Sequence, residues 1–170
     1  MIRLVRLSRA DRERLFEMMD EWTASDEKIT PYAIVRNDYH DFEHYLDEIE
    51  VRPDNDEGLV PDSTLFALDT GTNTFVGAVN IRHTLNEYLL RYGGHIGDGV
   101  RPSRRGEGIA TQMIALALEE CRRLGIRRVL MTCDKDNIAS ARTIQKNGGM
   151  LENEVEHDGE IVQRYWIDNV

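Results

Sequence analysis

The sequence predicts a single α/β domain of the mixed α+β kind, in which helices flank a central, mostly antiparallel sheet. Three observations support this fold class. The chain of 170 residues fits one domain, and a chain of that length buries roughly 70% of the surface that its unfolded state exposes. Predicted strands outnumber predicted helices. No internal repeat and no long polar linker divides the chain, so we expect residues 1–170 to form one domain.

The first part of the chain predicts one strand and two helices. Residues 2–7 alternate apolar and polar side chains, as a half-buried strand does. Apolar residues recur at helical spacing within residues 9–24, and again within the acidic segment 38–56. Each of these two segments therefore predicts an amphipathic helix with one face on the core.

The rest of the chain predicts six further strands and two helices. A polar loop around Gly71 and the pair Asp158-Gly159 each lie between apolar runs, so each predicts a hairpin. Gly125 and Gly148 are good helix stops, because glycine is favoured just after a helix. In chain order the predicted elements are strands 64–68, 74–81 and about 94–100, helix 109–124, strand 126–132, helix 137–146, and strands 150–156 and 161–167.

The composition is that of a globular protein with a strong negative charge. Hydrophobic residues make up 41%, charged residues 31%, and the formal net charge is -10. We find neither a long apolar run nor a signal-peptide pattern, so we expect a cytoplasmic protein. The charge argues against binding to nucleic acid or to anionic membranes, and it is compatible with a small cationic substrate. Cys121 and Cys133 lack zinc-site spacing, so we expect reduced structural thiols and no metal.

The segment with the clearest chemistry runs from the end of a predicted strand into the first turn of a long helix. It comprises Arg105, Gly106, Glu107, Gly108, Ile109 and Ala110. The first amide groups of a helix lack intrahelical partners and the helix dipole adds partial positive charge, so anions bind there. The glycines let the backbone approach an anion closely, and Arg105 adds a positive charge. We expect the Glu107 side chain to point outward while its backbone N–H faces the anion.

The pair Gly106-x-Gly108 also resembles the start of a dinucleotide-binding fingerprint. The third glycine of that fingerprint would fall at Thr111, and the preceding strands predict an antiparallel meander instead of βαβ units. Asp134, at the distance of a ribose-binding acid, is the one feature that favours this alternative.

The same segment resembles a known family. Residues 105–110 match the Arg/Gln-x-x-Gly-x-Gly/Ala motif of the GCN5-related N-acetyltransferases (GNAT), and the element order is similar over nearly the whole chain. Asn137 with Ser140, followed by residues 146–149, looks like the second signature of the family. Gly149 replaces the aromatic residue that usually ends this signature.

The resemblance implies acetyl-CoA as cosubstrate, without a metal, and a sheet that splays between its fourth and fifth strands. The pantetheine arm would lie in this gap and pair with backbone groups near Val100. The amides of residues 106–110 would hold the pyrophosphate, and Arg105 would neutralise part of its charge. Asn137 and Ser140 would lie on the pantetheine side. Homodimers are common in the resembled family.

The expected reaction is direct attack of an amine on the thioester, with the oxyanion held by a backbone N–H near Gly99 or Val100. His95 lies about where several members of the family have a catalytic Glu, and a histidine suits a base at neutral pH. It can equally satisfy a buried hydrogen bond, and Asp98 is the second candidate. The usual tyrosine acid is replaced by Ile144, so Tyr165 or water would protonate the thiolate, or the thiolate would leave unassisted.

The resemblance implies an N-acetyltransferase that acts on a small-molecule amine or a protein amino group. Tyr32 and Tyr39, near a set of acidic residues, are candidates for contact with the acceptor. An acidic, aromatic groove would suit a polyamine-like cation, but the same acids can be an ordinary solvated helix face. The alternative function is a sensor or interaction module that binds acyl-CoA without efficient turnover.

Overall fold

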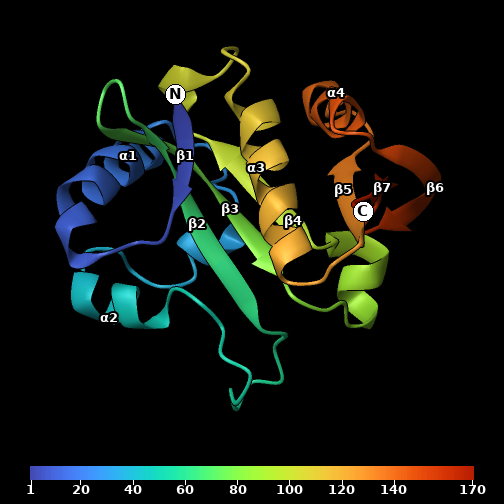
Figure 1. Ribbon diagram of the computed structural model, residues 1–170, viewed down its shortest axis with the longest axis horizontal. Coiled ribbons are helices and arrows are strands. Elements are labelled where there is room, and N and C mark those ends of the chain that lie inside the picture. The colour runs from blue at the N-terminus through green and yellow to red at the C-terminus, as the bar shows by residue number, and fades with distance from the viewer.

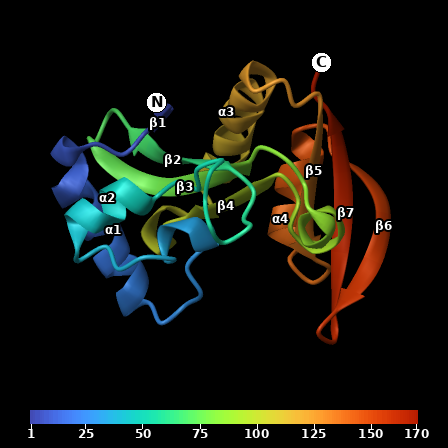
Figure 2. The same cartoon turned by 90° about the horizontal axis from the view of Figure 1, so that it is seen from below.

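The computed structural model describes residues 1–170 and places seven strands in two antiparallel sheets (Figures 1 and 2). The first sheet has the order β1-β2-β3-β4 and the second the order β5-β7-β6. The strands of the first sheet are β1 (Ile2–Val5), β2 (Asp62–Asp69), β3 (Thr74–Arg82) and β4 (Ile96–Val100). Those of the second are β5 (Arg128–Asp134), β6 (Met150–His157) and β7 (Glu160–Asp168). No ladder joins β4 to β5, which confirms the predicted splay.

Helices cover both faces of the first sheet. Figure 2 shows α3 (Ile109–Arg123) on one side of it and α1 (Arg12–Ala24) with α2 (Phe42–Glu48) on the other. Helix α4 (Ile138–Lys146) packs beside α3 and against β5. Helix α3 therefore lies where the two sheets meet, and its N-terminus faces the gap between them.

Two apolar cores follow from this layering. The larger core joins α3 to both sheets and includes Met113, Met131 and Ile144. The smaller core lies between α1, α2 and the other face of the first sheet, where the rings of Phe66 and Phe75 stack with centroids 5.1 Å apart. Because the larger core spans the splay, apolar packing keeps the two sheets together although hydrogen bonds do not.

The second helix is much shorter than predicted. The acidic segment 38–56 predicts one long helix, but α2 covers only Phe42–Glu48. The backbone N–H of Val51 donates to the carboxylate of Asp62 at 2.6 Å instead of to a helical carbonyl. Pro53 lacks the N–H that a helix interior needs. The chain therefore leaves the helix and crosses to β2.

Three short turns were not predicted. They are η2 (Tyr32–Ile34), η3 (Leu89–Gly93) and η4 (Pro102–Arg104), and all are too brief to show a hydrophobic period. Of these, η3 packs against β5, β6 and β7, so it bridges the two sheets at the closed end of the splay. None of the helices combines the length and the apolarity needed to cross a membrane.

Candidate functional site

At the closed end of the splay, two hydrogen bonds join His95, just before β4, to Leu130 of β5. The His95 backbone N–H donates to the carbonyl of Leu130 at 2.7 Å, and the Leu130 N–H donates to His95 Nδ1 at 2.9 Å. Gly94 allows this approach, since its φ is +70° and a Cβ there would lie 2.6 Å from the Leu130 carbonyl oxygen. Beyond this contact β4 and β5 diverge (Figure 2).

This contact determines which ring nitrogen of neutral His95 carries the proton. Because Nδ1 accepts an N–H, the proton of the neutral ring is on Nε2, and neither nitrogen has a free lone pair. Burial, with a smaller effect of nearby Arg82, lowers the pKa of His95 to about 4. The residue is only 7% exposed. These features favour the structural role that the sequence also allowed over the role of base.

The edge of β4 that faces β5 has unused backbone groups. The Arg101 N–H donates to the Val76 carbonyl. The register of β3 with β4 then places the backbone groups of Gly97 and Gly99 in hydrogen bonds to β3. The N–H and C=O groups of the intervening Asp98 and Val100 point toward the gap. The carbonyl of Val100 accepts a bond from Arg105 Nε at 3.2 Å. The oxyanion donor expected near Gly99 or Val100 is therefore best matched by Val100 or Asp98.

The predicted anion cradle lies at the mouth of this gap. Gly106 and Gly108 have φ values of +80° and +75°, and space for a Cβ is open at both. Gly108 is the N-cap of α3. The amide groups of residues 106–111, which include Glu107, Ile109 and Ala110, have no acceptor within the protein. The local geometry is therefore a row of free donors at a helix start.

The arginines of the cradle are paired with carboxylates. Arg105 Nη1 lies 2.5 Å from Glu27, in the loop after α1. Arg104 bonds Glu107 at 2.7 Å, so the Glu107 side chain does turn away from the free amides. Arg104 also bonds Asp69 at 3.0 Å. The side-chain and backbone bonds that Asp69 accepts lower the pKa of its carboxyl to about 2, the largest effect coming from Arg104.

Arg101 is a site residue that the sequence reasoning missed. It is buried, donates from Nε to Glu21 at 2.7 Å, and reaches the Phe75 carbonyl at 3.0 Å. Glu21 also accepts the Ser103 N–H at 2.8 Å. These bonds fasten the loop that enters the cradle to α1. No local pattern distinguishes Arg101 from the neighbouring arginines, because its partners are about 80 residues away in the chain.

On the opposite side of the gap, Asn137 and Ser140 begin α4. The side-chain oxygen of Asn137 accepts the Ser140 N–H at 3.1 Å, so this asparagine caps the helix. Its amide nitrogen has no partner in the protein. Burial raises the pKa of the nearby Cys133 thiol to about 11, an effect that the Ser140 hydroxyl partly opposes. Both cysteines are free, as predicted.

The sequence-predicted titratable groups differ in their exposure, and Tyr165 is 2% exposed in the larger core. Asp98 is partly exposed, accepts no side-chain bond, and burial raises its pKa to about 6. The Tyr165 hydroxyl donates to Gln163 at 2.9 Å, and the Cys133 thiol lies 4.0 Å from the same oxygen. Ile144 is 1% exposed in the larger core and offers no proton. No cluster of three or more His, Cys, Asp or Glu side chains is arranged to hold a metal ion.

The two tyrosines expected near the acceptor lie in different places. Tyr32, 67% exposed, lines a cavity of about 400 Å³ beside β3 and η3. Tyr39 is 8% exposed and packs in the smaller core, with its hydroxyl 2.5 Å from Asp20. Its ring packs edge-on against Phe16. The Tyr39 ring is therefore part of the core between α1 and α2, and it does not line the cavity that Tyr32 lines.

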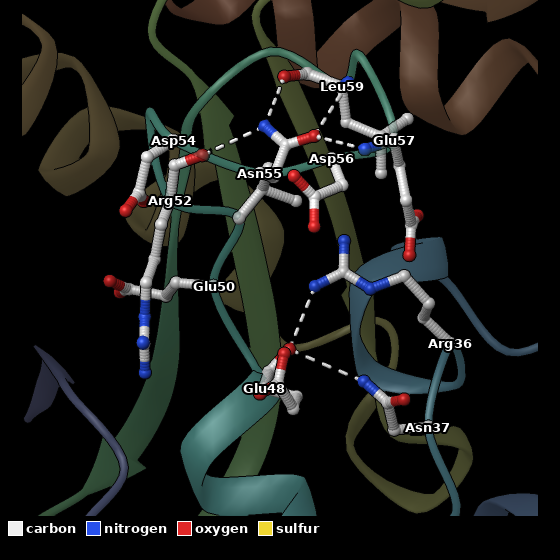
Figure 3. Close-up of a pocket in the computed structure, with 11 residues that line it drawn as sticks. Arg36, Asn37, Glu48, Glu50, Arg52, Asp54, Asn55, Asp56, Glu57 and Leu59 are labelled. Carbon is white, nitrogen blue, oxygen red and sulfur yellow. Dashed lines mark hydrogen bonds between the residues drawn. The ribbon is translucent and has the colours of Figure 1, made fainter.

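A larger cavity, of about 500 Å³, lies between η2, the end of α2 and the loop before β2 (Figure 3). Asn55 holds this loop together, since its side chain bonds the carbonyls of Arg52 and Leu59, each at 2.8 Å. Five of the lining residues are acidic: Glu48, Glu50, Asp54, Asp56 and Glu57. Arg36 also lines the smaller cavity, so the two cavities adjoin at this residue.

Comparison with known proteins gives a family and a set of similar folds. The family described as acetyltransferase (GNAT) domain matches residues 2–150. No curated protein sequence matches the chain. Among solved structures, RimL, a ribosomal L7/L12 alpha-N-protein acetyltransferase in complex with coenzyme A, has a TM-score of 0.67 at 19% identity. The match covers 98% of this chain and 93% of that one.

Two further structures show the same fold. The microcin C7 self-immunity acetyltransferase MccE, in complex with acetyl-CoA and AMP, has a TM-score of 0.66 at 20% identity, covering 98% of this chain and 92% of that one. A spermidine N-acetyltransferase SpeG chimera from Vibrio cholerae and hSSAT has a TM-score of 0.65 at 17% identity, covering 99% and 95%. At identities this low the similarity concerns the fold alone.

Proposed function

We propose that this chain, which belongs to the GNAT acetyltransferase family, transfers an acetyl group from acetyl-CoA to a primary amine by direct attack. The acceptor is a small molecule or a protein amino group. One observation carries the proposal: the free backbone edge of β4 ends at Val100, and the row of free amides at residues 106–111 follows it, tied to the strand by the bond from Arg105 to the Val100 carbonyl. A linear ligand with an anionic segment and a peptide-like arm fits these two features together.

The chain's own residues divide the binding of acetyl-CoA between them. The amides of residues 106–111 accept the pyrophosphate, and Arg105 exchanges Glu27 for a phosphate oxygen. The backbone N–H and C=O of Asp98 pair with the amides of the pantetheine arm, next to Val100. Asn137 and Ser140 bound the arm from the side of α4. Helix α3 thereby holds the charged end while β4 orients the thioester.

In the transfer step, Asp98 accepts the proton that the amine loses as its nitrogen attacks the thioester carbon. A carboxyl with a pKa near 6 is mostly ionised at neutral pH and remains a usable base. The Val100 N–H stabilises the negative oxygen of the tetrahedral intermediate. When the C–S bond breaks, Tyr165 gives a proton to the leaving thiolate. His95 holds β4 against β5 and takes no proton in this scheme.

A second function is favoured by one observation, the buried Ile144 where a proton-donating tyrosine was expected. In that alternative the chain binds acyl-CoA as a sensor and turns over poorly. A thiol-release assay with acetyl-CoA and a panel of primary amines distinguishes the two. Acceptor-dependent thiol release supports the enzyme. Tight binding of coenzyme A by calorimetry, with no release for any amine, supports the sensor.

A further inference from the structure

Arg82 differs from the other arginines of the protein's interior. Arg101 and Arg164 are buried, and each is paired with carboxylates. Arg82, on β3, is partly buried, and no carboxylate lies within 4 Å of its guanidinium. Nη1 donates to the carbonyls of Gly93 and Gly94 at 3.2 and 3.4 Å, while Nε and Nη2 have no acceptor in the protein. Burial lowers its pKa. An unpaired, desolvated cation is costly unless a ligand completes it.

Arg82 lines the cavity of about 400 Å³ that Tyr32 also lines. Asp62 is the one acidic residue in its lining, and its carboxylate is already engaged. It accepts the Val51 N–H at 2.6 Å and the Asn80 amide at 3.0 Å, and Arg36 lies 3.9 Å away. The cavity lining therefore contains two guanidinium groups and a single carboxylate, which is already hydrogen-bonded. Most of the remaining wall is apolar or aromatic.

Arg82 also contacts β4 next to the proposed base. A Cβ on Gly97 would lie 3.1 and 3.4 Å from the two terminal nitrogens of Arg82, so the guanidinium packs directly on the strand. Side chains alternate along a strand, so Gly97 faces Arg82 and the next residue, Asp98, faces the other side. No β4 residue lines the cavity itself, so a group held by Arg82 is separated from β4 by the guanidinium.

We propose that the acceptor is a small amine with a carboxylate a few bonds from its nitrogen, a free amino acid with an apolar side chain. Arg82 binds the carboxylate through its two unused donors, and the apolar wall takes the side chain. This inference rests on the proposed acetyl transfer. Arginine suits the role because its planar fork matches a carboxylate.

A polyamine is the competing acceptor, and the structure disfavours it in this cavity. The carboxylates that would attract a polyamine line the larger cavity (Figure 3). To place an amine beside β4, a polyamine would have to lay a cation against Arg36 and Arg82. Like charges in a partly buried site repel strongly.

The test uses matched acceptors: leucine with leucinamide and isopentylamine, and tyrosine with tyrosinamide and tyramine, alongside spermidine. Rates of thiol release are corrected for the unprotonated fraction of each amine, because amides and acids differ in amine pKa. We expect kcat/KM for each amino acid to exceed that of its amide by at least about tenfold. Equal or faster turnover of the amides, the decarboxylated amines or spermidine overturns the inference and leaves the acetyltransferase proposal intact.

Variants of Arg82 test whether this side chain causes the preference for amino acids over their amides. Arg82→Gln is expected to lower kcat/KM for leucine by about 10- to 100-fold and to leave leucinamide within about threefold, with Arg82→Lys intermediate. Arg91→Gln, an exposed arginine on η3, is the matched control and keeps the preference for the acid. A parallel loss for leucine and leucinamide means that Arg82 serves only the fold, and contradicts the proposal.

Binding to the wild-type protein provides a readout that needs neither turnover nor a variant. With coenzyme A present, 4-methylpentanoate is expected to raise the melting temperature, and 4-methylpentanamide is not. Equal shifts for the two ligands contradict the carboxylate site. If no amine is acetylated while the acid alone shifts the melting temperature, the transfer proposal fails and the carboxylate site stands.

Discussion

Asp98 is a carboxyl in the gap between β4 and β5 without a hydrogen-bonding partner, and its pKa is raised to about 6 by burial. We predict that Asp98→Asn lowers kcat/KM by about 10²- to 10⁴-fold, the usual contribution of a general base. The acidic limb of the wild-type pH profile, near pH 6, should disappear in the variant. An unchanged limb would show that another group is the base.

The same substitution affects stability with a definite sign. The folded-state pKa lies above the unfolded value of 3.8, so the ionised carboxylate destabilises the fold progressively as pH rises from about 4 to 6. Asp98→Asn should therefore raise the melting temperature at pH 7.5 and have little effect near pH 3.5. Asp168→Asn, at an exposed position on β7, is the control and should show no such trend.

At His95 we predict a structural effect. His95→Ala leaves the buried Leu130 N–H without an acceptor, which should lower the free energy of unfolding by about 1–3 kcal/mol. His95→Asn places an amide oxygen near the former Nδ1 and should recover most of this loss. Both folded variants should keep the pH profile of kcat. A loss of kcat of about 100-fold in well-folded His95→Asn would restore histidine as the base.

At the scale of elements, the start of α3 is tested by a pair of glycines. Gly108 and Gly125 flank α3, have φ values of +75° and +79°, and both have open space where a Cβ would be. Valine strains the backbone equally at the two sites. We predict that Gly108→Val weakens coenzyme A binding by at least about tenfold in calorimetry, whereas Gly125→Val leaves it unchanged. Equal affinities in both variants would refute the cradle.

The loop after α1 competes with the ligand for Arg105. Glu27 pairs with this arginine at the protein surface, so the pair must open before a phosphate can bind. We predict that Glu27→Gln strengthens coenzyme A binding by about two- to fivefold at low salt, and that the gain shrinks as salt rises. A weaker affinity in this variant would mean that Glu27 helps to hold the cradle open.

The regular elements were predictable because their signals are local. The period of 3.6 in α3 and the turn at Asp158-Gly159 depend on neighbouring residues only, and both are found in the structure. The start of α3 at Gly108 was predictable for the same reason. The short α2, the buried Arg101 and the role of Tyr39 were not, because each depends on a partner distant in sequence: Asp62, Glu21 and Asp20. Arg82 likewise shows its unpaired state only in the folded chain.

At the scale of the whole molecule, two sheets share a core but are linked at one point between β4 and β5. A ligand in the gap should connect them. We predict that coenzyme A at 100 times its Kd stabilises the fold by about 2.7 kcal/mol. Hydrogen exchange should slow at the amides of Asp98, Val100 and residues 106–111. Peptides from α2 should exchange at the same rate with and without ligand, and protection spread evenly over the chain would contradict this site.

The contact between His95 and Leu130 also determines which side chains of β4 face each side of the sheet. Counted from this contact, odd-numbered positions Gly97 and Gly99 face Arg82 and Thr30, and even-numbered positions face the gap. Inserting one residue after His95 would exchange these two sets. Ile96, which is 2% exposed in the larger core, would leave that core, and the Asp98 carboxylate would turn out of the gap. An insertion of two residues would keep both side chains on their present sides.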